Sequence, residues 1–187
     1  MKKILLLSIS LLSLQLSAQN VELTIMQNSV KAKNDSLYFR YRIQNKSDTV
    51  FVFYNVDIIG VALNFNGEII NPFQTNFIAF IYDKENNLPS TMWANTRHRT
   101  YEEDSIYYSY LNKYIVLKPG EAVEYDSKML IGNYGLKKGM YKFQLKYFCS
   151  DYYKQKYARD RRKYNLLKNS FLFEGEAKSN ECSFRLW

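Results

Sequence analysis

The only histidine of the chain, His98, is the residue on which acid–base or nucleophilic catalysis would have to depend. A Ser-His-Asp or Cys-His arrangement needs an imidazole that exchanges a proton near neutral pH. His98 lies between Arg97 and Arg99, whose positive charges disfavour its protonated form, and no nucleophile-elbow motif surrounds it. We therefore expect a solvated loop histidine, no catalytic residue, and a protein that is not an enzyme.

Metal binding has equally weak support in the sequence. Glu102, Glu103 and Asp104 are consecutive carboxylates that could hold a hard cation, but a calcium loop spaces its ligands around a glycine turn, which is missing here. One histidine and two widely spaced cysteines form no usual ligand cluster for a transition metal. The sequence predicts no metal site and no bound cofactor.

The strongest functional signal is the basic segment Tyr152 to Lys168, YYKQKYARDRRKYNLLK, which holds seven basic residues and one acid. A helical period places its tyrosines on one side and spreads its cations over the remainder. Basic residues interleaved with aromatics suit polyanions such as nucleic acid, anionic lipid or an acidic glycan. The predicted binding surface comprises Tyr153, Lys154, Tyr157, Arg161, Arg162, Lys163 and Tyr164. In the alternative interpretation, the tyrosines pack the segment onto the domain and the charges keep it soluble.

The first residues predict export. Lys2 and Lys3 precede an apolar run that ends near Leu16 and is followed by the small residues Ser17 and Ala18, which is typical of a secretory signal peptide over residues 1–18. The run is too short to span a bilayer, and no later stretch is long and apolar enough to do so. We expect a periplasmic or extracellular protein without a membrane span. In that compartment nucleic acid is not an expected partner, and the sequence does not indicate an oligomeric state.

The two cysteines, Cys149 and Cys182, are an even pair in a chain expected to meet an oxidising compartment. Both fall on the core-facing phase of late strands, and antiparallel pairing of those strands would bring them together. The sequence therefore predicts a disulfide between them. The alternative is two buried thiols that pack as small hydrophobes.

The elements that must position these residues are strands. Ser36 to Gln44, SLYFRYRIQ, alternates apolar and polar residues, which is typical of an antiparallel strand with one buried face. The other predicted strands are Val21 to Met26, Thr49 to Tyr54, Ile58 to Phe65, Glu68 to Ile70, Phe77 to Tyr82, Tyr114 to Leu117, Ala122 to Leu130, Tyr141 to Cys149, Phe171 to Phe173 and Glu181 to Trp187. We predict one domain over residues 19–187, with insertions at about 88–113 and 150–172.

Three short motifs carry a family resemblance. An Asn-x-Ser turn follows the early strand at Asn45 and Ser47, a Lys-Pro-Gly-Glu turn starts at Lys118, and Leu-x-x-Gly-x-Tyr leads into Tyr141. The combination resembles small exported bacterial immunoglobulin-like β-sandwich domains and is partly similar to BsuPI-type proteinase inhibitors. The resemblance implies an all-β, immunoglobulin-like antiparallel β-sandwich, to which the helical period of the basic segment adds a short helical insertion before the last strand. It also implies that Tyr141 is a tyrosine corner, whose hydroxyl bonds to the backbone a few residues upstream.

The sequence thus predicts a non-catalytic exported module that binds through its loops. The expected partner is a protein or an acidic glycan or lipid of the cell envelope. The alternative function is that of an inhibitor or immunity-type protein acting on a secreted hydrolase or toxin.

Overall fold

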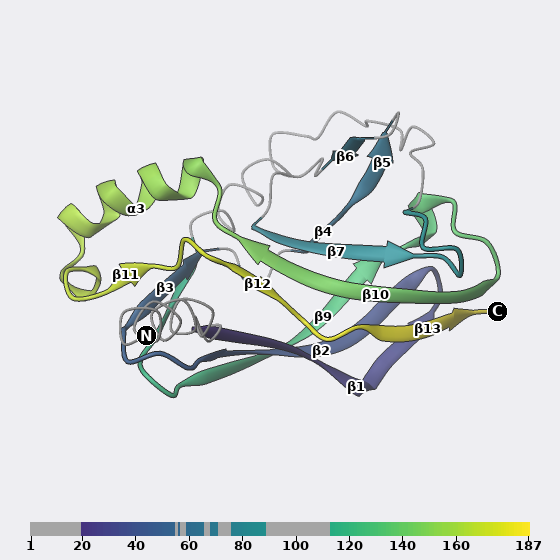
Figure 1. Cartoon of the computed structure of the whole chain (residues 1–187), viewed down its shortest axis with the longest axis horizontal. Helices are drawn as coiled ribbons and strands as arrows, with labels where there is room; N and C mark the ends of the chain where they lie inside the picture. The colour runs from purple at the N-terminus through teal and green to yellow at the C-terminus, as the bar shows by residue number, and fades with distance from the viewer. Residues whose placement is uncertain (1–19, 55, 57–58, 66–67, 71–75, 89–112) are drawn as a thin grey trace, which may run out of the picture.

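The computed structural model describes residues 20–54, 56, 59–65, 68–70, 76–88 and 113–187 (Figure 1). Most of these residues lie in strands, and one long helix precedes the last strands. The elements are β1 (Val21–Lys33), β2 (Ser36–Asn45), β3 (Phe51–Tyr54), β4 (Ile59–Val61), β5 (Leu63–Phe65), β6 (Glu68–Ile70), β7 (Phe77–Tyr82), β8 (Tyr114–Leu117), β9 (Ala122–Leu130), η1 (Gly132–Tyr134), β10 (Gly139–Phe148), α3 (Asp151–Lys163), η2 (Asn165–Leu167), β11 (Phe171–Leu172), β12 (Glu176–Lys178) and β13 (Cys182–Leu186).

The first sheet has the order β1-β2-β9, and both pairings are antiparallel. The residues of the central strand β2 alternate between apolar and polar, as the sequence predicted. This alternation decides which face of the sheet is buried. Leu37, Phe39 and Tyr41 are buried, whereas Tyr38 and Arg40 are exposed on the opposite face. A sheet with one apolar face must bury that face against another layer.

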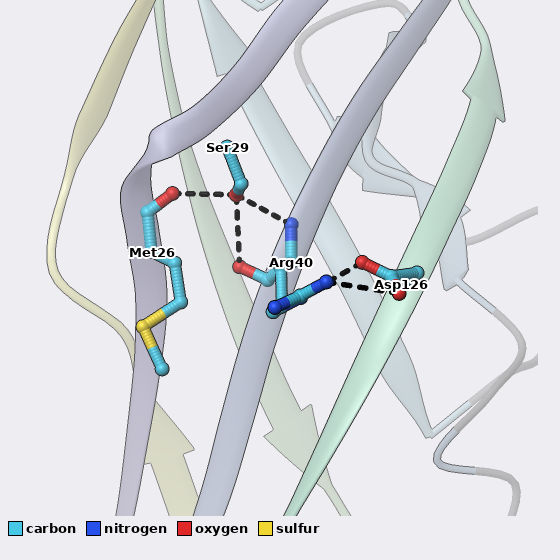
Figure 2. Close-up of polar contacts among 4 residues, drawn as sticks. All are labelled: Met26, Ser29, Arg40 and Asp126. Carbon is cyan, nitrogen blue, oxygen red and sulfur yellow. Dashed lines mark hydrogen bonds and ion pairs between the residues drawn. The ribbon is translucent and has the colours of Figure 1, made fainter.

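A bulge in β1 interrupts this sheet and is closed by a serine hydroxyl (Figure 2). The register passes from the pair Met26 and Arg40 to the pair Lys31 and Tyr38, so β1 carries extra residues at this point. Ser29 Oγ accepts the Arg40 backbone N–H at 2.7 Å and donates to the Met26 carbonyl at 2.6 Å. The hydroxyl thereby replaces the strand partner that the bulge removes from Arg40.

The second sheet is built on β10, which pairs on one side with β7 and on the other with β12 and β13. All three of these pairings are antiparallel, and β4 continues the sheet parallel to β7. The buried residues of β10 alternate along the strand as Tyr141, Phe143, Leu145 and Tyr147. In Figure 1 this sheet lies across the sheet formed by β1, β2 and β9.

The main core fills the space between these two sheets. Buried side chains from β1, β2, β7, β10 and β13 belong to a single cluster. Ring contacts cross the interface, and the rings of Phe39 on β2 and Phe143 on β10 lie 5.1 Å apart between centroids. Two facing sheets around one apolar core give the chain an all-β architecture.

The Asn180 side chain connects the two main sheets along one edge. Its side chain accepts the Ile25 N–H at 2.8 Å and donates to the Ile25 carbonyl at 3.1 Å, as a neighbouring strand would. Asn180 lies between β12 and β13, where the chain leaves the β10 ladder for a short distance. This amide therefore satisfies both backbone groups of a residue that is almost completely buried.

A smaller sheet of order β11-β3-β8 carries the helical insertion. Its central strand β3 is apolar on both faces, as the run from Thr49 to Tyr54 predicted. Phe53 points into the main core, whereas Val52 and Tyr54 belong to a second cluster with Tyr153 of α3. The helix is thus the layer that covers the far side of β3.

One turn confirms a local prediction, and the length of β1 corrects another. Gly120 has a φ of 77°, as expected after Pro119, and the Glu121 N–H closes this turn on the Lys118 carbonyl at 3.0 Å. The strand predicted over Val21 to Met26 is longer in the structure, because β1 continues to Lys33. Asn34 and Asp35 then form a two-residue turn with φ values of 49° and 57°, which suits a tight hairpin.

The predicted disulfide is also wrong in this structure. Cys149 and Cys182 are both buried, as the strand phase indicated, but both are free. Cys182 pairs with Phe143, which precedes Cys149 by six residues along the chain. Six residues of strand span about 20 Å, whereas a disulfide needs Cα atoms within about 7 Å. The two thiols belong to different clusters, Cys182 to the main core and Cys149 to the cluster under α3.

Candidate binding surface on helix α3

Helix α3 forms where the sequence predicted a helical insertion, and its charges follow its direction. Asp151 lies in the first turn, and Arg161, Arg162 and Lys163 lie in the last turn. An acid near the N-terminus and cations near the C-terminus both complement the helix dipole. Part of the positive charge of this segment therefore stabilises the helix itself.

The inner face of α3 packs onto β3. Tyr153 is almost completely buried, and its ring stacks on that of Tyr54 with centroids 5.3 Å apart. Leu167 and Leu172, after the helix, complete the same cluster. These contacts bury the apolar stripe of the helix, as the packing alternative expected.

A polar contact lies beside this apolar cluster. The Tyr54 hydroxyl donates to Asp160 Oδ2 at 2.9 Å, and Lys156 Nζ lies 3.0 Å from the same oxygen. The side chains of Lys156 and Asp160 are only 12% and 16% exposed. Burial, with Asp160 nearby, raises the pKa of Tyr54, so its hydroxyl stays protonated and acts as the donor.

The segment after α3 is tied back to the helix. The Tyr157 hydroxyl donates to the Ser170 carbonyl, and Arg161 Nη2 donates to the Lys168 carbonyl at 3.0 Å. The Arg161 guanidinium also lies 6.0 Å from the centre of the Phe171 ring. These contacts hold the helix, η2 and β11 as one surface.

Five cations gather on the exposed side of this surface. They are Arg159, Arg161, Arg162, Lys163 and Lys168. None of them pairs with a carboxylate in the part of the chain that the structure describes, whereas Lys154 pairs with Asp151 at 2.9 Å and Lys156 with Asp160. A shallow depression of about 460 Å³ is lined by Tyr157, Ala158, Arg161, Arg162 and Lys168. We call these five cations and this depression the α3 basic surface.

The structure separates the predicted binding residues into three groups. Arg161, Arg162 and Lys163 lie on the exposed side, and Tyr164 is 40% exposed beside Lys163. Tyr153 is a core residue, and Tyr157 is half-buried against the Ser170 carbonyl. Lys154 is partly exposed, but its charge is compensated by Asp151.

Two cations of the α3 basic surface were absent from the predicted set. Arg159 lies two residues before Arg161 on the exposed side, and Lys168 follows η2. Helical spacing alone could have found Arg159, because the buried tyrosines Tyr153 and Tyr157 define the opposite side. Lys168 could not be placed by helical spacing, since it reaches the surface through the turn after the helix.

A second, smaller depression lies at the other end of β10. It has a volume of about 290 Å³ and is lined by Lys138, Gly139, Arg185, Leu186 and Trp187. The Arg185 guanidinium lies 4.2 Å from the centre of the Trp187 ring. None of these residues belongs to the predicted binding surface, and the depression has fewer charged residues than α3.

The remaining candidate residues lie outside the described part of the chain. His98 and the acids Glu102, Glu103 and Asp104 fall in residues 89–112, and the predicted signal peptide falls in residues 1–18. Within the described ranges, no helix has the length and apolarity needed to cross a bilayer. Neither the protein-family models nor the curated proteins with which the sequence was compared give a match.

Proposed function

We propose that this protein is an exported, non-catalytic binding module that contacts an acidic component of the cell envelope, or an acidic protein face, through the α3 basic surface. The observation that carries the proposal is the concentration, over α3 and the turn after it, of five exposed cations that have no acidic partner among the described residues. Like charges held this close repel one another in the free protein. An anionic partner would relieve that repulsion.

The geometry of the surface supports a ligand with several anionic groups. The depression between Arg161, Arg162 and Lys168 is open, so a chain or an extended surface can lie across it. Guanidinium groups present paired donors to carboxylate, phosphate and sulfate oxygens. Arg161 is already positioned by its bond to the Lys168 carbonyl, which lowers the entropy lost on binding.

We further propose that the scaffold is immunoglobulin-like, as the motif resemblance implies. The Tyr141 hydroxyl donates to the Lys137 carbonyl at 2.8 Å, which is the contact expected of a tyrosine corner. Asn45 of the Asn-x-Ser turn is buried, and its side-chain amide donates to the carbonyls of Thr49 and Leu117. These contacts support the resemblance at the motifs on which it rests. The export of the chain is proposed from residues 1–18 alone.

The proposal is tested with a triple variant that removes charge without removing contacts. The side chains of Arg159, Arg162 and Lys168 make no hydrogen bond, ion pair or ring contact within the described residues. Arg159→Gln, Arg162→Gln and Lys168→Gln together lower the charge by three. The matched control replaces Lys31, Lys33 and Lys137, which are exposed elsewhere, by glutamine.

The measurement is the salt concentration that elutes each protein from heparin agarose. We expect the triple variant to elute at clearly lower salt and the control variant to elute close to the wild type, because the binding of heparin to the α3 basic surface is local and electrostatic. Equal shifts for the two variants would mean that only net charge matters and would overturn the proposed site. Unchanged thermal unfolding of both variants serves as the folding control.

A further inference from the structure

We infer that the acidic component recognised by the α3 basic surface is an anionic lipid bilayer, on which α3 and β11 lie with exposed aromatic side chains at the interface. This inference rests on the proposed function and narrows its partner. Its basis is a second property of the same surface, which is that large apolar side chains are exposed among the cations.

Three of the seven large hydrophobic residues exposed in the described part of the chain lie in α3 or directly after it. They are Tyr152, Tyr164 and Phe171, with exposed fractions of 51%, 40% and 57%. Aromatic residues are favoured at the level of lipid headgroups, where an apolar ring meets polar surroundings. Basic residues with aromatics beside them are the composition of an interfacial surface.

Phe171 is held outward by its backbone. Its N–H donates to the Val50 carbonyl at 2.9 Å, and the next residue, Leu172, is buried in the cluster beneath α3. In a strand, successive side chains point to opposite faces, so Phe171 lies on the face opposite to Leu172, where its side chain is 57% exposed. The pairing of β11 with β3 fixes the backbone that sets this direction.

A cation is fixed beside this ring. Arg161 donates to the Lys168 carbonyl and lies over Phe171, which places a positive charge and an apolar ring at the same level of the surface. Lys163 lies in the same way over Tyr164, with its Nζ 5.2 Å from the ring centre. A soluble acidic polymer would use the charges but would gain little from an exposed phenylalanine. An anionic bilayer would interact with the charges through its headgroups and with the phenylalanine ring at its interface.

The position of these elements leaves them accessible to a flat surface. Figure 1 shows α3 and β11 together at one end of the molecule, with the C-terminus at the opposite end. The long strands of the two main sheets extend away from this end. A membrane can therefore meet α3 and β11 without first meeting the sheets.

The test is sedimentation with vesicles of phosphatidylcholine, either pure or with about one-third phosphatidylglycerol. We expect the wild type to bind the anionic vesicles only, and to be released at high salt. At roughly 1 kcal/mol for each cation near an anionic surface, the triple variant of Arg159, Arg162 and Lys168 should bind about 100-fold more weakly. The control variant of Lys31, Lys33 and Lys137 should bind like the wild type.

The aromatic contribution is tested separately by Phe171→Ser. Its matched control is Leu130→Ser, because Leu130 is 60% exposed on β9. We expect Phe171→Ser to weaken vesicle binding several-fold and to leave elution from heparin agarose unchanged, whereas Leu130→Ser should alter neither. Equal vesicle binding by Phe171→Ser and the wild type would overturn the aromatic anchoring.

The outcomes distinguish this inference from the proposed function. Retention on heparin without binding to anionic vesicles would overturn the bilayer as the partner and leave the binding function in place. If the wild type bound neither heparin nor anionic vesicles, both the inference and the proposed function would be overturned. Equal binding to neutral and anionic vesicles would also overturn the inference, since the cations would then have no part in it.

Discussion

The hydroxyl of Tyr54 lies 2.9 Å from Asp160 Oδ2, and this hydrogen bond connects strand β3 to helix α3. The segment from Tyr152 to Lys168 contains seven basic residues and one acid, which is Asp160. Its carboxylate binds Tyr54 and Lys156, while the cations of the segment that pair with no acid in the described ranges are exposed. The one acid of the segment therefore orients the helix on the sheet.

Removing the Tyr54 hydroxyl should loosen this attachment. Hydrogen bonds to charged groups contribute about 1.5–3 kcal/mol, and the apolar ring of Tyr54→Phe keeps its packing against Tyr153. We expect Tyr54→Phe to lower the free energy of unfolding by about 1–3 kcal/mol in urea. The control is Tyr114→Phe, since the Tyr114 hydroxyl makes no hydrogen bond among the described residues. A loss for Tyr54→Phe no greater than that of the control would contradict the role of the contact.

Asn180 should contribute more to stability than an exposed asparagine usually does. Asn180→Ala leaves the buried N–H and carbonyl of Ile25 without their partners, and an unsatisfied buried group costs about 1–3 kcal/mol. Asn180→Asp can still accept the Ile25 N–H but cannot donate to its carbonyl, so we expect a smaller loss. Urea unfolding of both variants checks the order. An alanine variant as stable as the wild type would show that solvent replaces the amide at this edge.

The two cysteines should react as thiols. Denatured protein prepared without reductant is expected to titrate two thiols per chain with a disulfide reagent, because both cysteines are free. In the folded protein the reaction should be slow, since both side chains are buried and burial raises the pKa of Cys149 to about 11. A count of zero in the denatured protein would restore the disulfide that the sequence predicted.

The folded protein should lose stability in acid through its surface ion pairs. Hydrogen bonding to Lys146 lowers the pKa of Glu176 below 4.5 in the folded state. A carboxylate with a lowered pKa stabilises the fold above its unfolded pKa, and that contribution is lost as the pH falls through the folded pKa. Lys146→Met should cost less than about 1 kcal/mol at pH 7, because the pair is partly exposed, and nothing at about pH 2–3. The difference is measured by urea unfolding at both pH values, and a cost that persists in acid would mean that Lys146 acts through packing alone.

Much of the strand content could be predicted from local patterns. The alternation from Ser36 to Gln44 gave β2 with the correct buried face, and the turn chemistry of Pro119 and Gly120 gave the boundary between β8 and β9. The helical period of Tyr153 and Tyr157 likewise gave α3 and its inner face. These features depend on residues close together in sequence, so their signals are local.

The missed features depend on pairing between distant residues. The sequence did not predict β12, which pairs with the far end of β10 before the chain leaves the ladder at Asn180. That register, and not the phase of the strands, separates Cys149 from Cys182. The polar residues Ser179 and Asn180 resemble a loop locally, and only their bonds to distant strands, Ser179 to Leu145 of β10 and Asn180 to Ile25 of β1, show that they close an edge.

Strand β3 has apolar residues on both faces, and α3 is what covers the second face. Consequently the helix cannot be exchanged for a short linker in the way that a surface loop can. Its removal would leave Val52 and Tyr54 against water, and the protein would be expected to associate through that face or to unfold. For protein engineering, Arg159 and Arg162 are the α3 cations to substitute, because their side chains make no hydrogen bond, ion pair or ring contact within the described residues, but the helix that carries them is part of the minimal foldable unit.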